Sequence, residues 1–360
     1  MRRILPRRPS GQPSGTGYHL TMSIFRRDPT SNEWVILAPR RFSRPHAPRR
    51  EGREARVEFD PSCPFCPGNE HETPPEILRR PAADAGEPWQ VRVFPNLYAA
   101  VSPDGDESRG GDGPFQEMRG RGAHEVVVES PRHDARLDEM KVEATASMLE
   151  VWRERYTALH RRHEIRAVIV FKNFGVGAGT SLLHPHAQIV AVPVYPPQWM
   201  HALNVSMRYF DATGRSVYDD VVEGEREAGV RMVAESDGFI AFCPFASKTP
   251  FETWILPTAH QSSFGRLADD DVPALAALVR DVLGRLRVAA GDPDFNLVVY
   301  SAPDDAAQVR LFRWHLRLVP RITLPAGFEM GSGMSINTLM PEDAAEAMRT
   351  ANVAAEASRE

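Results

Sequence analysis

Two apolar stretches flank a glycine-rich segment near the middle of the chain. Residues 166–171 (Arg-Ala-Val-Ile-Val-Phe) precede this segment and residues 189–193 (Ile-Val-Ala-Val-Pro) follow it. Short runs rich in β-branched residues are typical of buried strands, so the pattern predicts two β-strands joined by a glycine-rich bend. The second strand begins near His184 and His186. Because residues two apart in a strand share a face, both imidazoles are expected in one site.

The same pattern predicts further strands and two long helices. Strand-like runs cover residues 34–38, 90–94, 124–133 (strand and turn), 251–260, 295–300 and 312–320. Apolar residues at helical spacing predict helices at residues 137–161 and 267–286. Residues 102–121 are rich in Gly and Asp and are expected to form a surface loop, and residues 197–229 a connector.

These elements recur in the same order at a nearly constant separation. His133 and His260 are 127 residues apart, and His186 and His315 are 129 residues apart. Such agreement predicts an internal duplication of about 130 residues. The second copy has Arg313 at the position of His184. We therefore expect the first copy to keep a reactive site at its histidine pair and the second copy to have lost part of that site.

The duplication divides the chain into two halves with short tails. We place the N-terminal half at residues 22–197 and the C-terminal half at residues 198–350. Residues 1–21 are rich in Arg, Pro, Gly and Ser and have no apolar signal-peptide core, so a disordered basic tail is expected. Met22 is an alternative start, and residues 351–360 form a C-terminal tail.

Composition narrows the class of protein. The chain is 42% hydrophobic and 25% charged, which is ordinary for a globular protein, and its net charge is −5. This charge argues against a broad nucleic-acid surface. No stretch of about 18 apolar residues exists, so no membrane span is expected. Three cysteines do not make a disulfide framework, and we expect a cytoplasmic location.

Cysteine and histidine residues suggest a metal site. Cys63 and Cys66 form a Cys-x-x-Cys pair, which supplies one side of a tetrahedral zinc site. A redox pair is the alternative, although no thioredoxin-like βαβ pattern surrounds it. The remaining ligands would come from His124, His133 or His184.

The glycine-rich segment suggests phosphate chemistry. Glycines let the backbone approach a phosphate and form an anion-binding nest of N–H groups. A histidine beside such a nest can attack phosphorus as a nucleophile. Arg41 and Arg44 follow the strand at residues 34–38 and could meet phosphate oxygens, with a solvated basic loop as the alternative.

The segment from His184 to Gln188 (His-Pro-His-Ala-Gln) resembles the active-site signature of galactose-1-phosphate uridylyltransferases, a branch of the histidine-triad superfamily. Matching segments occur in order at residues 26–30, 34–39, 63–69, 93–96, 130–133 and 327–330. The resemblance implies an α+β fold in which a histidine-triad-like unit is duplicated, each half an antiparallel sheet with flanking helices. The segment that begins at Gly327 is also similar to ADP-glucose phosphorylases or adenylyltransferases.

The resemblance also implies roles for individual residues. His186 would be the nucleophile that attacks the α-phosphorus of a nucleotide sugar, and Gln188 would hydrogen-bond the phosphoryl oxygens. Substrate contacts are implied for Arg41, Arg44, Asn96, Asn173, Gly179, Thr180, Ser181, Gln188, Gly327 and Phe328. One structural zinc ion would be bound by Cys63, Cys66, His133 and His184.

Some family members carry a second metal site, built from a Glu after the His-x-His strand and three later histidines. Residues 198–202 contain no Glu here, and Arg313 stands where a histidine is expected. His260 and His315 alone make a poor site. We therefore expect the second metal to be absent.

The implied reaction is a ping-pong transfer through His186. UDP-glucose would give its uridylyl group to this histidine, and galactose 1-phosphate would then take it. The alternatives are an ADP-glucose phosphorylase or adenylyltransferase, a nucleotide-sugar hydrolase with the same histidine, and a non-catalytic nucleotide sensor. The presence of both His186 and Gln188 argues against the sensor. Dimers are usual in the family, and a homodimer is therefore among the expected partners.

Overall fold

The structure of the 360-residue chain is a computed structural model. It describes residues 22–43, 56–82, 85–104, 108–302 and 310–353. The expected disordered tail at residues 1–21, most of the C-terminal tail and the candidate Arg44 lie outside the described residues.

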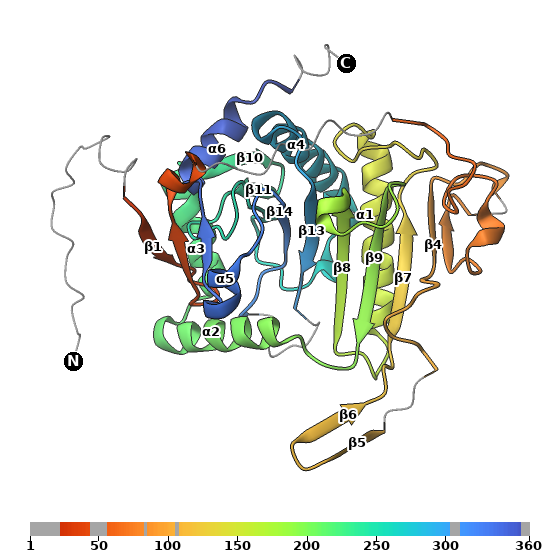
Figure 1. Ribbon diagram of the computed structural model, residues 1–360, viewed down its shortest axis with the longest axis horizontal. Coiled ribbons are helices and arrows are strands. Elements are labelled where there is room, and N and C mark those ends of the chain that lie inside the picture. The colour runs from red at the N-terminus through yellow and green to blue at the C-terminus, as the bar shows by residue number, and fades with distance from the viewer. Residues whose placement is uncertain (1–21, 44–55, 83–84, 105–107, 303–309, 354–360) are drawn as a thin grey trace.

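A ten-stranded antiparallel sheet crosses the molecule (Figure 1). From one edge to the other its strands are β3 (Leu78–Arg80), β4 (Val91–Pro95), β7 (Ala123–Val128), β9 (His186–Val192), β8 (Ala167–Phe174), β13 (Phe295–Tyr300), β14 (His315–Pro320), β12 (Thr253–Pro257), β11 (Phe239–Phe242) and β10 (Met232–Ser236). All nine strand pairs are antiparallel.

The strand order confirms that the fold is duplicated. Counted from either edge of the sheet, the two halves present their strands in the same sequence order, so β9 corresponds to β14 and β8 to β13. The two halves meet where β8 pairs with β13, with Asn173 opposite Asn296 and Val170 opposite Val299. The two expected sheets are therefore joined edge to edge into one.

Two equivalent helices cover one face of this sheet. α1 (Val142–His160) and α4 (Val272–Ala290) pack against each other and against the central strands (Figure 1). In α1, the fully buried Met148, Trp152 and Tyr156 recur every four residues, so they lie on one side of the helix. They join alternate residues of β9, such as Ile189, in the main hydrophobic core.

The segment at residues 197–229 is not a simple connector, and that prediction was wrong. It forms α2 (Pro197–Thr213) and α3 (Val217–Ala228). Pro197 occupies the start of α2, and Gly214 and Gly229 end the two helices in the left-handed conformation. These capping signals were present in the sequence.

The expected surface loop at residues 102–121 contains a short hairpin. Its strands β5 (Arg109–Asp112) and β6 (Phe115–Met118) are almost wholly exposed and project from the body (Figure 1). Gly111, at φ +108°, allows a close approach: a Cβ there would lie 1.8 Å from the carbonyl oxygen of Phe115.

A small second sheet joins the two ends of the described chain. β1 (Ile24–Arg27) pairs with β2 (Trp34–Leu37), and β2 pairs in parallel with β15 (Ser335–Asn337). β15 follows the short helix α5 (Gly327–Ser332) and precedes α6 (Pro341–Thr350). The Asn337 amide donates to the Ser247 carbonyl, and Arg26 pairs with Glu342 of α6. The small sheet is thus fixed to the second half.

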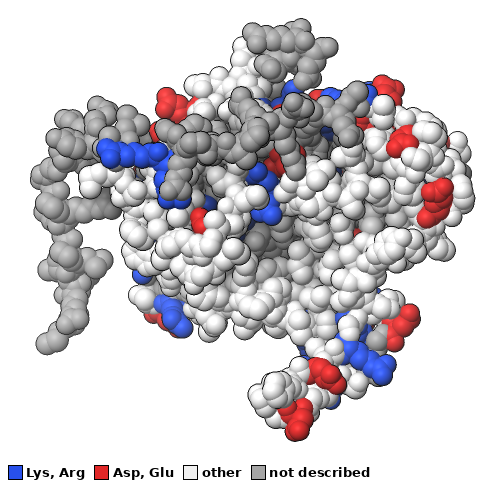
Figure 2. All heavy atoms as spheres, in the orientation of Figure 1, with Lys and Arg blue, Asp and Glu red and all other residues white. Residues whose placement is uncertain are grey.

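Charged side chains on the face drawn in Figure 2 are scattered. Lysines and arginines occur there in small separate groups, and the projecting hairpin carries both signs (Figure 2). In the part of the chain that the structure describes, no helix is long and apolar enough to cross a bilayer.

Candidate active site

The start of β9 divides its side chains between two faces of the sheet. Ala187 and Ile189 belong to the core beneath α1, so His186 and Gln188 lie on the opposite face. Val126 and Val128 of β7, which pair with Gln188 and His186, belong to a separate apolar cluster on that opposite face. The predicted nucleophile and the predicted phosphate ligand therefore share the face away from the long helices.

His186 is held in one tautomer. Its Nδ1 lies 2.8 Å from the carbonyl oxygen of His184, which can only accept, so Nδ1 carries the hydrogen. Nε2 then has a lone pair, and it has no partner among the described residues. Burial lowers the pKa of His186 to about 4, and the nearby charge of Lys172 acts in the same direction. The imidazole is therefore neutral near pH 7, as a nucleophile requires.

Four side chains form a compact cluster next to His186. The ligand atoms of Cys63, Cys66, His133 and His184 all lie within 4.8 Å of one another. The Sγ of Cys66 is 3.5 Å from the Nδ1 of His133 and 3.6 Å from that of His184. Sulfur and nitrogen ligands of a tetrahedral zinc ion lie about 3.5 Å apart. The cluster could therefore bind a metal ion, and His124 is not part of it.

The groups behind this cluster are arranged for metal binding. The Nε2 of His184 lies 2.8 Å from the Ser130 carbonyl oxygen and must donate to it, which leaves the Nδ1 lone pair facing the thiols. Burial raises the pKa of the Cys63 thiol to about 11. A metal ion would displace this proton, as thiolate ligation requires. A site completed by two imidazoles favours metal binding over the redox alternative.

An ion pair supports the same strand from the helix side of the sheet. The ammonium group of Lys172, on β8, contacts the carboxylate of Glu129, which follows β7, and both side chains are buried. The same ammonium lies 3.4 Å from the carbonyl oxygen of His186. The Glu129 N–H donates to the Pro185 carbonyl at 3.1 Å. The start of β9 is therefore tied to both neighbouring strands.

The glycine-rich bend is fixed by a residue of the second half. Gly175 has φ +83°, and a Cβ there would lie 1.9 Å from the Asp294 carboxylate. That carboxylate accepts from the Gly177 N–H at 2.6 Å. Gly179 has φ +89°. A Cβ built on it would lie 3.9 Å from the side-chain nitrogen of Asn173. Only glycine fits the first position, because a side chain would displace the carboxylate that holds the bend.

The predicted phosphate contacts of this segment differ in their availability. Asn173 accepts from the Asn296 amide at 2.8 Å through Oδ1, so its own NH₂ group is turned toward Gly179. The Thr180 hydroxyl donates to the Leu182 carbonyl at 2.9 Å and is thus used within the loop. Ser181 is exposed. Asn173, Gly179 and Ser181 are therefore the members of this set best placed to meet a ligand.

The sequence did not indicate two residues of this region, Asp294 and Asn296, and it suggested a metal-binding role for a third, His124. Asp294 and Asn296 come from the second half and hold the bend, and His124 contacts Gln188. The side chains of Gln188 and Asn96 both approach the Nε2 of His124, at 2.8 and 3.1 Å. The predicted duplication could have pointed to Asn296, because it places residues 295–300 at the position of the strand before the bend.

The remaining predicted contacts lie elsewhere in the chain. Arg41 is in a short 3-10 helix (Pro39–Ser43) that follows β2, and Gly327 and Phe328 begin α5. Both segments adjoin the small sheet, on the side of the second half (Figure 1). Among the described residues, no hydrogen bond or ion pair joins these three to the side chains of His186 or Gln188.

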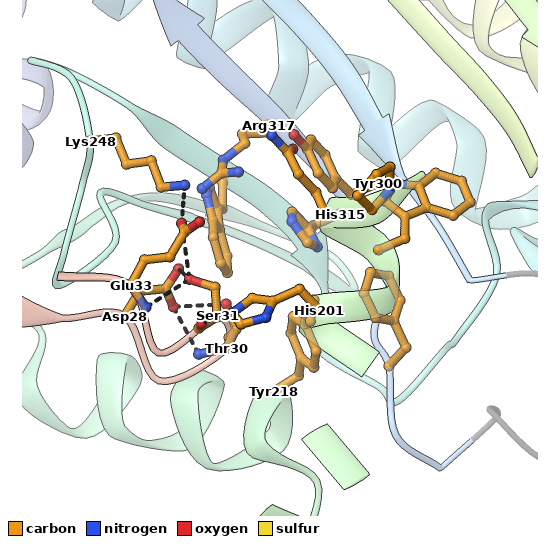
Figure 3. A pocket seen from close by; sticks show the side chains of 16 residues that line it. Asp28, Thr30, Ser31, Glu33, His201, Tyr218, Lys248, Tyr300, His315 and Arg317 are labelled. Carbon is orange, nitrogen blue, oxygen red and sulfur yellow. Dashed lines mark hydrogen bonds and ion pairs between the residues drawn. The ribbon is translucent and has the colours of Figure 1, made fainter. Parts of the chain in front are cut away.

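The second half retains a cavity beside the counterpart of His186. Its volume is about 250 Å³, and His315 and Arg317 of β14 line it together with the turn between β1 and β2 (Figure 3). His315 Nδ1 lies 3.1 Å from the Arg313 carbonyl, as His186 lies against His184. Its ring is stacked on Trp254 and Tyr300, with centroids 4.4 and 5.2 Å away.

The second half holds a guanidinium where the first half has its metal cluster. Arg313 occupies the position of His184 and donates to the carbonyl oxygens of Pro257 and Thr258, at 2.8 and 2.9 Å. It also contacts the Asp219 carboxylate at 2.7 Å, and His260 contacts the same carboxylate at 2.8 Å. Of the two histidines left from the family's second metal site, His260 thus shares a carboxylate with Arg313, and His315 does not contact this carboxylate.

Comparison with known proteins agrees with this fold. The family model described as "Galactose-1-phosphate uridyl transferase, N-terminal domain" matches residues 18–196, and a domain of unknown function (DUF4921) matches residues 129–359. An ADP-glucose phosphorylase of Arabidopsis thaliana is 33% identical over 90% of this chain and 92% of its own length. A galactose-1-phosphate uridylyltransferase of Thermotoga maritima is 26% identical over 92% of this chain and 99% of its own length.

Solved structures extend the agreement to the whole fold. The crystal structure of an ADP-glucose phosphorylase from Arabidopsis thaliana with bound ADP-glucose superposes with a TM-score of 0.80 at 32% identity. It covers 92% of this chain and 99% of that one. The chain therefore belongs to the galactose-1-phosphate uridylyltransferase family, whose members include nucleotidyltransferases and phosphorylases.

We expect the purified protein to contain about one metal ion per chain, bound by the four clustered side chains. Cys63→Ser should lose most of this metal and become less stable, because three ligands bind more weakly and the loop loses its anchor. Elemental analysis gives the metal's identity and amount, and thermal denaturation gives the stability.

Cys243→Ala is the matched control, because Cys243 is buried but lies outside the cluster. This variant should keep its metal. Two metal ions per chain, or equal metal in the Cys63→Ser variant, would contradict this assignment.

Proposed function

We propose that the protein transfers a nucleotidyl group from a nucleotide sugar through a covalent intermediate on His186. The observation that carries the proposal is the hydrogen bond from His186 Nδ1 to the His184 carbonyl. This bond leaves a neutral imidazole whose Nε2 lone pair lies on the same face as Gln188 and Asn173. Fixed amides next to a nucleophile suit an attack on phosphorus, because they can stabilise the charge that develops on its oxygens.

The proposed transfer takes place in two steps at the α-phosphorus. Nε2 attacks the α-phosphorus, a P–N bond forms, and the bond from that phosphorus to the bridging oxygen breaks, releasing sugar 1-phosphate. In the second step an oxygen of the acceptor phosphate attacks the same phosphorus and the P–N bond breaks. The lone pair returns to Nε2. No general acid is needed, because a phosphate leaving group is stable as an anion, and Gln188 could not supply a proton.

We propose that the bound metal is a structural zinc ion. Two thiolates and two imidazoles are a donor set that zinc prefers, and four protein ligands leave no open position for substrate. Its contribution would be to fasten the loop that bears Cys63 and Cys66 to the start of β9, next to the nucleophile.

ADP-glucose with inorganic phosphate is the substrate pair that we place first. The sequence alone favoured UDP-glucose and galactose 1-phosphate. The higher identity to the ADP-glucose phosphorylase, 33% against 26% for the uridylyltransferase, supports adenylyl transfer instead. Phosphate attack on an adenylyl-histidine would give ADP and leave glucose 1-phosphate as the other product.

We further propose that the complete site needs two copies of the chain. Phe328 is 46% exposed, and its segment adjoins the small sheet rather than the bend between β8 and β9. If Phe328 contacts substrate as the resemblance implies, it does so in the site of a partner copy. This agrees with the homodimer expected for the family.

Without an acceptor, we expect ADP-glucose to release at most about one glucose 1-phosphate per chain, because the covalent intermediate then stops the reaction. Adding phosphate should start steady turnover. His186→Ala should reduce turnover by at least about 10⁴-fold, as removal of a nucleophile does in other enzymes. The same assay with UDP-glucose and galactose 1-phosphate gives the base preference.

His163→Ala is the control for this assay, because His163 is an exposed histidine. It should turn over like the wild type. Continuous release of glucose 1-phosphate without an acceptor would identify a hydrolase. No release from either nucleotide sugar would contradict the proposed function.

Subunit complementation tests the shared site. The single variants His186→Ala and Phe328→Asp should both be nearly inactive, the second because a carboxylate would face the phosphates. Co-expressed, they should recover about a quarter of wild-type activity, since half of randomly formed dimers contain one intact site of two. Activity no greater than the sum of the two separate variants would show that each chain builds its own site.

A further inference from the structure

His124 has no part in the metal cluster, although its residue type made it a candidate ligand. It lies on β7, where it pairs with Val190 of β9. Paired residues of an antiparallel sheet share a face, so its side chain lies on the same face as that of Gln188, two residues before Val190. The side chain is thus placed to act on the predicted phosphate ligand.

The backbone N–H of Ala100 fixes the tautomer of His124. This N–H donates to the Nδ1 of His124 at 3.1 Å, so Nδ1 has the lone pair and cannot carry a hydrogen. The imidazole is therefore neutral, with its hydrogen on Nε2. That Nε2–H lies 2.8 Å from the Oε1 of Gln188 and donates to it.

This bond fixes the direction of the Gln188 amide. With Oε1 occupied by the imidazole, the NH₂ group is the end left for a ligand, and it has no partner among the described residues. An amide turned the other way would present an oxygen to the phosphoryl group and would repel it. We propose that His124 is a positioning residue that keeps the N–H groups of Gln188 directed at the phosphoryl group carried by His186. This inference rests on the proposed function.

Asn96 is oriented around the same imidazole. Its Oδ1 accepts from the Tyr98 N–H at 2.8 Å, so its amide nitrogen is the atom that lies 3.1 Å from His124 Nε2. Both nitrogens carry hydrogens in this arrangement, so they do not hydrogen-bond to each other. The N–H groups of Asn96 are therefore left for an acceptor on the substrate, and His124 separates two amides that both present donors.

Two substitutions of His124 distinguish its contact with the Ala100 N–H from its contact with Gln188. In His124→Asn, the side-chain oxygen can accept from the Ala100 N–H, but the shorter side chain does not reach Gln188. In His124→Gln, the side-chain NH₂ group can take the place of Nε2–H and donate to Gln188. We expect His124→Asn to slow the release of glucose 1-phosphate in a single turnover by about 10- to 100-fold, the effect of one hydrogen bond to a charged group. His124→Gln should restore most of the rate.

A double-mutant cycle tests whether His124 acts through Gln188. Gln188→Met removes the amide that His124 orients, so adding His124→Asn to it should slow the reaction by less than about 2-fold. Both single variants should keep the metal content and melting temperature of the wild type. Rates that multiply in the double variant would overturn the inference, as would equal rates for His124→Asn and wild type.

Nitrogen-15 NMR of labelled histidines gives a readout independent of activity. The expected signal for His124 is the neutral ring with hydrogen on Nε2, identified by its loss in His124→Gln. A hydrogen on Nδ1, or a doubly protonated ring at pH 7, would overturn the inference even if the enzyme is active. Conversely, a wild type that releases no sugar 1-phosphate overturns the proposed function, and the positioning role of His124 with it.

Discussion

The structure of the site depends on His184, because its side chain and its backbone serve different neighbours. The imidazole faces the thiols of Cys63 and Cys66, and the backbone carbonyl accepts from His186. Any movement of the cysteine loop would therefore shift the imidazole of His186, the predicted nucleophile. The buried pair of Lys172 and Glu129 holds the same strand from the opposite face. A histidine whose strand is fixed from both faces suits the proposed role of His186, because preorganised groups need little reorganisation before a reaction.

The two halves of the duplicated fold differ at the start of their equivalent strands β9 and β14. At the start of β9 the first half has a cluster that could bind a metal, and at the start of β14 the second half has the guanidinium of Arg313. Arg317 lies where the first half has Gln188 and pairs with Glu252 at 2.7 Å. The second half thus has an ion-paired guanidinium where the first half has a neutral amide.

The second half nevertheless contributes to the first site. Asp294 and Asn296 flank the start of β13 and hold the glycine bend and Asn173. They act across the junction between β8 and β13, two strands that are more than a hundred residues apart in the chain. The second half thus supplies structural support to the candidate site of the first half.

The sequence was informative where function depends on local spacing. Cys-x-x-Cys, His-x-His and the glycine bend are each recognisable within a few residues, and the four candidate metal ligands do lie together next to His186. The roles of Asp294, Asn296 and His124 depend on strand pairing, which local patterns do not specify. The helices α2 and α3 were missed although Pro197, Gly214 and Gly229 signalled their ends. The placement of Phe328 away from the bend needed the three-dimensional fold.

Of the pseudo-symmetric pair His186 and His315, we propose that His186 carries the nucleotidyl group. Mass spectrometry of the intact protein after incubation with ADP-glucose and no acceptor measures this directly. We expect a mass increase of one adenylyl group, located by peptide mapping on His186 and removed by added phosphate. An adduct on His315 or His184, or an adduct that phosphate does not remove, would contradict this proposal.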